Sequence, residues 1–536
     1  MLADRWFEEY FFGFYPSQGT VAGLHEYDNK LEDYSRAGVE ARITMLHSFE
    51  KQFAGAPVTD DHDLVLGKIR ADLLELESIR QWEKNPDVYS SGPTSSIFGL
   101  MSRNFGPQAD RLKSVIARER QIPKVLQDGR ANLKTPPRIY TEIALEQLPG
   151  LISFFQKDVP LAFNKVSDQK LLAEFHSTNQ EVIDELRSYG TFLKNDLLPR
   201  SNGDFRIGAE NYSKKLSYEE MVDVPLDELL KVGYADLRRN QQWFEEVARQ
   251  IDPNKTPQQI LSEQEKDHPA PDKLLDAFRN VLGGLKDFIV EHKIIDIPSP
   301  VLPILEETPP FERATTFASM DTPGPYEKVA KEAFFNVTLA DPSWTKERIE
   351  EHMESFNRGT IISTAVHEAY PGHYVQFLWM QQIPDRVRKL IGANTNAEGW
   401  AHYCEQMMLD EGYAGGDPKL RLGQLQDALL RDARYVVGIE MHTGKMTFDQ
   451  AVDFFVKEGY QPRATGLVET KRGTADPTYL YYTLGKLQIM KLREDYKKMR
   501  GKDFNLQEFH DAFMKQGFPP IRIVRHALLG NTGPLL

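Results

Sequence analysis

The stretch STAVHEAYPGHYVQFLWMQQIPDRVRKLIGANTNAEGWAHYCEQMM, residues 363–408, holds two histidines on either side of a glutamate. His367 and His373 flank Glu368, and Glu398 follows in a second helical segment. Zinc prefers nitrogen and carboxylate ligands, and a catalytic zinc site keeps one position open for water. A glutamate beside a ligating histidine can take a proton from that water. The stretch therefore predicts a metal site, with a helix–turn–helix junction whose histidines are only polar caps as the alternative.

The spacing of the two histidines departs from the familiar H-E-x-x-H helix, in which they are four residues apart. His367 and His373 are six apart, which on a regular helix separates them by about 120°. Pro371 cannot donate to the helical ladder, and Gly372 tolerates backbone angles that other residues avoid. We therefore expect the helix to be interrupted between Glu368 and His373, so that His373 turns back toward His367.

The paired motifs also carry a resemblance. HEAYPGH followed by AEGWAHYCEQ resembles the HExxPGH…EGWAxYxE pattern of the domain-of-unknown-function family 885, whose members are regarded as mainly helical and zinc-metallopeptidase-like. These members are similar in layout to the gluzincins of the angiotensin-converting-enzyme and thimet-oligopeptidase group. Further stretches resemble family blocks, so the resemblance covers nearly the whole chain; they lie at 9–28, 198–212, 434–455 and 481–493.

The resemblance assigns roles on the second motif helix. Glu398 matches the family's presumed third metal ligand, after His367 and His373. Glu405 matches a later glutamate of the family pattern. Such a glutamate can orient a ligating histidine by a hydrogen bond to the ring nitrogen that does not bind the metal. Glu398, His402 and Glu405 are spaced i, i+4 and i+7, so they share one helix face. His402 stands at a variable position of the pattern and is a candidate ligand or proton donor.

Attack of water on a carbonyl also needs a donor that stabilises the oxyanion. Tyr482 stands three residues before Gly485 and matches the family's Y-x-x-G; a tyrosine hydroxyl donates a hydrogen bond without being charged. His442 is the second candidate. The alternative for both is a buried side chain with a structural hydrogen bond.

Four further residues are left open by the sequence. Arg434, Arg463 and Arg472 are each able to bind a substrate's terminal carboxylate, and nothing in the sequence selects among them. Cys404 is the single cysteine of the chain, so no intramolecular disulfide is possible. We interpret it as a small buried residue in preference to a ligand or nucleophile.

Composition excludes some classes of function. Hydrophobic residues make up 40% and charged residues 27% of the 536 residues, which is typical of globular proteins. A net charge of −14 argues against nucleic acid as the main partner. No apolar run is long enough to span a membrane, and the N-terminal residues do not resemble a signal peptide. The cytoplasm is therefore the default expectation, with an exported mature form as the alternative; the oligomeric state is open.

Helical periodicity dominates the chain, as in residues 61–83. Residues 292–326 are rich in proline and threonine, which favours extended segments and turns, and residues 333–339 predict a short strand. We expect a mainly α fold of two helical lobes, residues 1–290 and 291–536, with a cleft between them and a small β-sheet beside the metal helix.

The expected function is a zinc-dependent metallopeptidase that hydrolyses short peptides, with one Zn²⁺ held by His367, His373 and Glu398 and with Glu368 activating water. A metal-dependent hydrolase of another amide or ester is the nearest alternative. A non-catalytic helical binding protein with a structural metal site is the other; such a site usually has four protein ligands and needs no general base.

Overall fold

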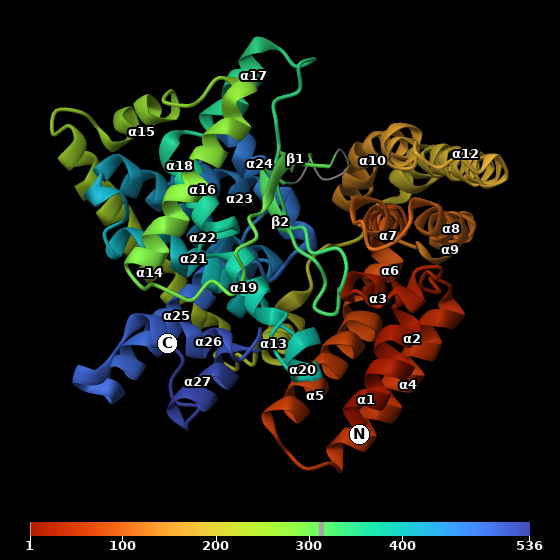
Figure 1. Ribbon diagram of the computed structural model, residues 1–536, viewed down its shortest axis with the longest axis horizontal. Helices are drawn as coiled ribbons and strands as arrows, with labels where there is room; N and C mark the ends of the chain where they lie inside the picture. Colours follow the sequence, from red (N-terminus) through yellow and green to blue (C-terminus); the bar gives the residue numbers. More distant parts are fainter. Residues whose placement is uncertain (1, 310–312, 314–315) are drawn as a thin grey trace. The chain divides into compact units, whose positions relative to one another are not determined.

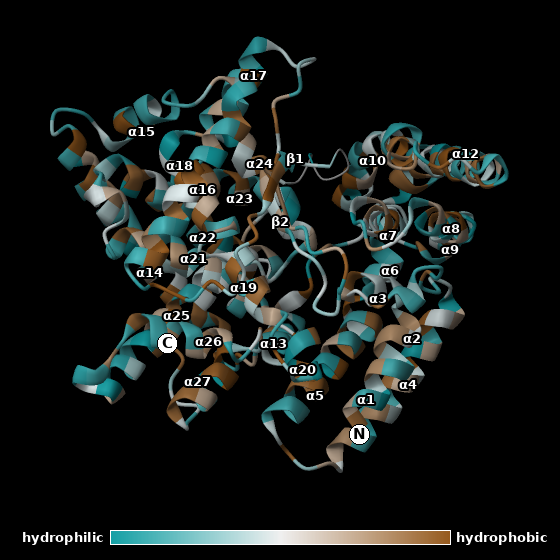
Figure 2. Ribbon diagram, viewed as in Figure 1, coloured by the Kyte–Doolittle hydropathy of each residue, from teal (hydrophilic) through white to brown (hydrophobic). Residues whose placement is uncertain are grey.

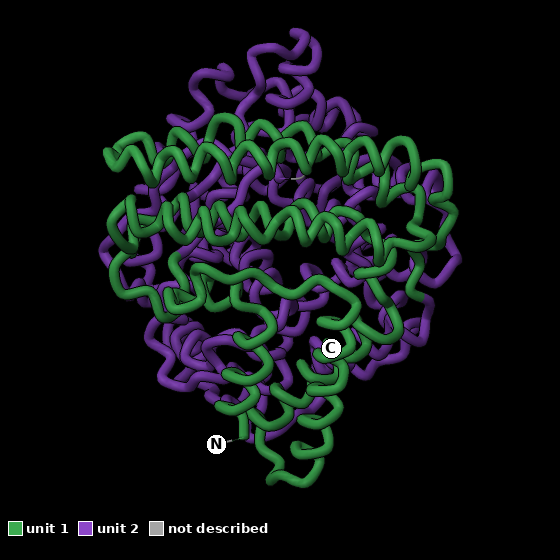
Figure 3. Tube along the Cα trace, turned by 90° about the vertical axis from the view of Figure 1, so that its right-hand side faces the viewer, with its two compact units in different colours: residues 1–207, 309–314, 323–332 green, residues 208–308, 315–322, 333–536 purple. Residues whose placement is uncertain are grey.

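The computed structural model describes residues 2–309, 313 and 316–536. The chain is mainly helical and carries one small three-stranded sheet, which confirms the predicted fold class (Figure 1). It divides into two compact units, coloured separately in Figure 3. Unit 1 comprises residues 1–207, 309–314 and 323–332, and unit 2 comprises residues 208–308, 315–322 and 333–536. The expectation of a cleft between two lobes stays a prediction.

Unit 1 is helical, and short 3₁₀ and π segments extend or join several of its helices. The helix predicted at residues 61–83 is present as α5, which a π segment at Leu74–Ile79 continues. Thr59 caps α5 by accepting a hydrogen bond from the His62 amide, and acidic residues in the first turn favour a helix N-terminus. The α-helices are α1 (Leu2–Trp6), α2 (Phe12–Phe14), α3 (Pro16–Ala22), α4 (Arg36–Ala54), α5 (Asp60–Leu73), α6 (Gln81–Lys84), α7 (Ser91–Ser102), α8 (Gln108–Glu119), α9 (Ile122–Asn132), α10 (Arg138–Ser153), α11 (Val159–Ala162) and α12 (Gln169–Phe192).

A buried carboxyl group joins α8 to α12 in unit 1 and leads to a testable prediction. Glu119 accepts hydrogen bonds from Thr178 and Asn179. Burial raises the pKa of the Glu119 carboxyl to about 8, although these hydrogen bonds oppose the shift. A pKa raised in the folded state favours folding at low pH, and this contribution is lost as the pH rises toward 8. Between about pH 4.5 and 8 the free energy of unfolding should therefore fall by about 1.4 kcal/mol per pH unit on account of Glu119.

Glu119→Gln should remove this dependence, because the amide keeps the shape and does not ionise. Chemical denaturation followed by circular dichroism at pH 6 and pH 8 would measure the difference between parent and variant. The exposed Glu181→Gln on α12 is the matched control and should keep the parent's pH dependence. Equal pH dependence in parent and Glu119→Gln would show that the carboxyl ionises without cost to the fold.

Unit 2 contains the sheet and the two motif stretches. Within the described residues, no helix combines the length and apolar character that a membrane crossing requires. The α-helices are α13 (Gly208–Glu220), α14 (Leu226–Ile251), α15 (Pro257–Glu265), α16 (Leu274–Glu291), α17 (Lys346–Glu354), α18 (Arg358–Glu368), α19 (His373–Met380), α20 (Arg386–Leu390), α21 (Asn394–Asp410), α22 (Pro418–His442), α23 (Phe448–Lys457), α24 (Arg463–Ala475), α25 (Tyr481–Arg500), α26 (Leu506–Met514) and α27 (Ile521–Leu529).

Residues 208–290 belong to unit 2, whereas the sequence placed a boundary near residue 290. The physical reason is tertiary packing: α14 packs along α22, and α16 packs against α18. Hydrophilic and hydrophobic residues follow one another along α14 (Figure 2). Its buried Leu237 and Phe244 share a core cluster with Leu425 and Leu429 of α22. This long-range packing has no signal in the local sequence.

The predicted strand at 333–339 is present as β3 (Phe334–Val337), the middle strand of the sheet. It pairs in parallel with β1 (Ile304–Glu307) and antiparallel with β2 (Ala318–Asp321). Phe335 of β3 packs edge-on against Phe278 of α16. β2 contacts α18, so the sheet lies beside the helix that carries His367. Of the extended region expected at 292–326, residues 310–312, 314 and 315 lie outside the described residues.

Candidate metal centre

The helix interruption predicted at Pro371–Gly372 is present. α18 ends at Glu368, and α19 begins at His373. A Cβ atom on Gly372 would lie only 1.8 Å from the His367 carbonyl oxygen, so the turn admits glycine alone. The Trp400 indole N–H of α21 donates to the Pro371 carbonyl at 2.9 Å and fixes the turn. The interruption thereby sets the direction in which the His373 ring leaves the chain.

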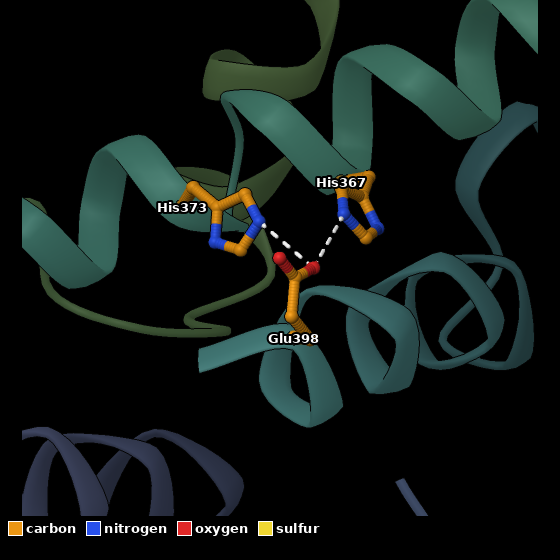
Figure 4. A group of neighbouring side chains, drawn as sticks. All are labelled: His367, His373 and Glu398. Atoms are coloured by element: carbon orange, nitrogen blue, oxygen red, sulfur yellow. Dashed lines mark ion pairs between the residues drawn. The ribbon is translucent and has the colours of Figure 1, made fainter. Parts of the chain in front are cut away.

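Figure 4 shows the His367, His373 and Glu398 side chains pointing toward one another from α18, α19 and α21. Glu398 Oε2 lies 3.3 Å from Nε2 of His367 and 3.3 Å from Nε2 of His373. One potential ligand atom from each of the three residues lies within 4.8 Å of the other two. The structure thus brings together the three side chains that the two sequence motifs single out.

These distances fit a bound metal ion. Two ligand atoms that each lie about 2.0–2.1 Å from a tetrahedrally coordinated zinc ion are about 3.3–3.4 Å apart. Both contacts of Glu398 Oε2 have this length, and yet this buried oxygen lacks hydrogen-bond geometry to any partner among the described residues. A buried carboxylate oxygen is costly without a partner. The donor set is therefore suited to a cation at the point where the three side chains converge.

Glu405 of α21 supports His367 from the side opposite Glu398. Its Oε1 lies 2.7 Å from His367 Nδ1 and 3.2 Å from Nη2 of Arg431. Its Oε2 lies 2.9 Å from Nδ1 of the fully buried His402. A carboxylate on the second ring nitrogen of a metal-ligating histidine fixes the orientation of that ring. The His373 Nδ1 atom, in contrast, has no such partner among the described residues.

The charges of this cluster shift its pKa values strongly. Burial lowers the pKa of the His367 imidazole, but the Glu398 and Glu405 carboxylates outweigh burial and raise it to about 9. Burial raises the pKa of Glu398, but the charge of His373 and the contacts with both histidines hold it well below its usual value. Burial and the Lys486 charge lower the pKa of His402 to about 3, so this ring is neutral at pH 7. The Glu398 and Glu405 carboxylates therefore stay ionised at pH 7, and a bound cation would have to displace the proton from His367.

A cavity of about 700 Å³ opens at the cluster, and its lining residues all belong to unit 2. Glu368, next to His367, lines this cavity, and within the described part of the chain its carboxylate forms no hydrogen bond. Tyr482 lines it from α25, with its ring centre 6.3 Å from that of His367. α25 approaches α21 closely where Gly485 meets Gly399, because a Cβ on Gly399 would lie 2.5 Å from the Gly485 Cα. Two glycines thus allow Tyr482 to reach the site.

The remaining predicted residues lie away from the cluster. His442 is buried at the end of α22, does not line the cavity, and has its Nε2 2.7 Å from the Gly473 carbonyl oxygen. The structure therefore does not bring His442 to the site. Burial raises the pKa of the Cys404 thiol well above its usual value, as expected for a small buried residue. Arg463 is exposed and pairs with Asp453.

The sequence did not single out Arg431, which lies on α22 and contacts residues of α21 and α25. Its guanidinium contacts Glu405 at 3.2 Å, and its Cζ lies 5.8 Å from the centre of the Tyr482 ring. The available signal was its position one helical turn before Arg434, the first residue of a family block. Three residues apart on a helix, the two side chains share a face.

The fold and the cluster together define a class of protein, namely a mainly helical protein with a histidine–glutamate centre at an interrupted helix. The chain belongs to the family described as "Bacterial protein of unknown function (DUF885)", whose model matches residues 16–528. This match confirms the resemblance found in the sequence. The comparison with curated proteins found no match.

Two solved structures are similar to the chain over nearly its whole length. One, described as a putative lipoprotein of unknown function from Shewanella oneidensis, is 25% identical, with a TM-score of 0.81, and the match covers 98% of this chain and 99% of that chain. The other, a putative lipoprotein from Colwellia psychrerythraea, is 17% identical, with a TM-score of 0.84, and the match covers 98% of each chain. The second likeness concerns the fold alone.

Proposed function

We propose that this protein is a zinc-dependent metallopeptidase that hydrolyses short peptides. The observation that carries the proposal is the convergence of His367, His373 and Glu398, with Glu398 Oε2 3.3 Å from both imidazoles. Glu368 beside this centre supports a catalytic site over a structural one, because a structural site needs no general base. Zinc in such a site would polarise the water and the substrate carbonyl.

Residues of the chain would provide the proton transfer and the stabilisation of the oxyanion. Glu368 takes a proton from the attacking water and returns it to the departing amine, so that a C–N bond is exchanged for a C–O bond with no net proton change. Burial and the charge of Glu398 raise the pKa of the Tyr482 phenol, so it keeps its proton at pH 7. Its oxygen accepts a hydrogen bond from Arg472 Nη2 at 3.1 Å, which leaves the hydroxyl hydrogen available for the developing oxyanion.

A peptide substrate is favoured by strand β2. Among the described residues β2 pairs on one side only, with β3, and residues 316–320 line the cavity. The unpaired edge of a strand can bind an extended peptide through main-chain hydrogen bonds. An ester or a non-peptide amide would gain less from such an edge, which is why we place the other hydrolases second.

The test combines metal analysis with a digest. Purified protein should contain about one zinc ion per chain, measured by mass spectrometry, and should cleave members of a library of short peptides. A chelator should abolish cleavage, and added zinc should restore it. Full zinc content without cleavage of any peptide would exclude the peptidase and leave the other hydrolase or the binding protein.

We also infer that the protein is exported, because the two solved structures reported above are each described as a putative lipoprotein. The cytoplasmic default has no support from these relatives. Fractionation of cells that express the full-length gene would test this inference, and recovery of the protein with the cytosolic fraction would contradict it.

A further inference from the structure

The cavity has a cationic side to which the proposed chemistry assigns no contact with the substrate. Three arginines, Arg431, Arg434 and Arg472, line the cavity and surround the Tyr482 ring. Their Cζ atoms lie 5.8, 4.8 and 5.7 Å from the centre of that ring. An arginine whose charge is already neutralised by a buried carboxylate is less able to bind a substrate anion. The ion-pair partners of the three arginines therefore indicate which of them is available to the substrate.

Two of these arginines are committed to buried carboxylates. Arg434 donates from Nε and Nη2 to both oxygens of Glu469, at 2.7 and 2.8 Å, and its side chain is 9% exposed. Arg431 pairs with Glu405 and is 11% exposed. A fork-to-fork pair such as Arg434–Glu469 is among the strong hydrogen-bonded ion pairs. Either arginine would have to give up its ion pair with a buried carboxylate in order to turn to a ligand.

Arg472 is different. Its side chain is 32% exposed, and among the described residues its one ion-pair partner within 4 Å, Asp476, lies at 3.3 Å. All hydrogen bonds that Arg472 forms within the described residues leave from Nη2, to Asp476, Tyr481 and Tyr482. Nε and Nη1 therefore have no hydrogen-bond partner in the described part of the chain. An arginine presents its donors in a planar fork that matches a carboxylate.

The distance between Arg472 and the candidate metal centre suits a bound peptide whose C-terminus lies at Arg472. Arg472 Cζ lies 5.7 Å from the Tyr482 ring centre, which lies 6.3 Å from that of His367. The guanidinium is thus no more than about 12 Å from the His367 ring, a span that about three or four extended residues cover. A carboxylate bound by Arg472 would lie close along the chain to the bond being cleaved.

We propose that Arg472 binds the C-terminal carboxylate of the substrate, so that the substrates are short peptides with a free C-terminus, cleaved within a few residues of that end. This inference rests on the proposed function and extends it from peptides in general to one class of peptide. Arg463, the other candidate on α24, pairs with Asp453, is 70% exposed, and does not line the cavity.

The experiment compares an alanine tetrapeptide as the free acid with the same peptide as its C-terminal amide. The zinc-loaded parent should prefer the free acid by about 10–100-fold in kcat/KM, the range expected for a hydrogen-bonded charged group. Arg472→Gln should bring the ratio close to one, Arg472→Lys should restore part of it, and Arg463→Gln on the same helix should leave it at the parent's value.

The ratio separates this role from a structural one. If Arg472 only positions Tyr482 and Asp476, Arg472→Gln lowers the rates for both peptides alike and the ratio stays high, which would overturn the proposal. A parent that cleaves both peptides equally well would overturn it too.

A binding arm separates this inference from the proposed function. Calorimetry with zinc-loaded Glu368→Gln should show binding of the free acid at least about ten times tighter than that of the amide, and Arg472→Gln in that background should remove the difference. If the free acid binds more tightly in this way but the parent cleaves no peptide, the carboxylate-binding role of Arg472 is supported and the proposed peptidase activity is excluded. No difference in binding between the two peptides would overturn the carboxylate site.

Discussion

Glu368→Gln is expected to lower peptide turnover by about 10²–10⁴-fold, the usual contribution of a positioned general base. Glu368 lines the cavity beside His367 but is not one of the three converging side chains. The amide keeps the size and shape of the carboxylate and cannot take a proton from water. The zinc content should therefore stay at the parent's level while kcat falls, measured by mass spectrometry and by a single-peptide assay on the same sample.

The matched control is Glu347→Gln, which makes the same chemical change at an exposed position of α17. It should keep the parent's rate and zinc content. A Glu368→Gln protein that hydrolyses peptides as fast as the parent would remove the base from the mechanism. Loss of zinc from Glu368→Gln would instead indicate that this carboxylate helps to hold the ion.

The sequence predicted the members of the cluster because their signals are local. Pro371 and Gly372 disrupt a helix by their own covalent structure, whatever surrounds them, so an interruption between Glu368 and His373 was predictable. Spacing along one helix placed Glu398 and Glu405 on a common face. The structure places Glu398 against both histidines and Glu405 behind His367. Their roles as ligand and orienting group stay predictions.

What the sequence did not predict depends on packing between distant segments. Arg431 reaches the site because α22 packs against α18 and α21. One close approach at this packing joins Gly359 to Gly423, where a Cβ on either would lie within 3.0 Å of the other's backbone. No local sequence pattern predicts a contact of this kind between two helices. The same holds for His442, whose motif is recognisable but whose ring lies against Gly473.

The compact units differ from the boundary drawn in the sequence for a similar reason. Composition changes near residue 292, where the extended segments begin, and the sequence boundary was drawn there. The compact units follow contacts instead, and α13 to α16 find theirs among the C-terminal helices. A composition change marks a change of secondary structure and need not mark the edge of a core.

Replacement of one of the three predicted metal ligands is expected to cause the largest loss of zinc affinity. His373→Ala and Glu398→Gln each leave two of the three converging groups, so zinc affinity should fall by more than the about 10–100-fold that loss of an outer partner costs. Peptide turnover should disappear together with the metal. Competition with a zinc chelator measures the affinity, and circular dichroism shows whether each variant is folded. His526→Ala, an exposed histidine on α27, should match the parent.

The zinc affinity of Glu405→Gln distinguishes a metal ligand from a residue that only orients a ligand. This substitution leaves His367, His373 and Glu398 in place and removes the carboxylate that lies 2.7 Å from His367 Nδ1. Its zinc affinity should therefore lie between that of the parent and that of the ligand variants, at about 10–100-fold below the parent. The expected order of affinity is parent, then Glu405→Gln, then His373→Ala and Glu398→Gln. If His373→Ala holds zinc as tightly as the parent, the ion does not sit among these three side chains, because a centre with only three protein ligands cannot lose one without weakening.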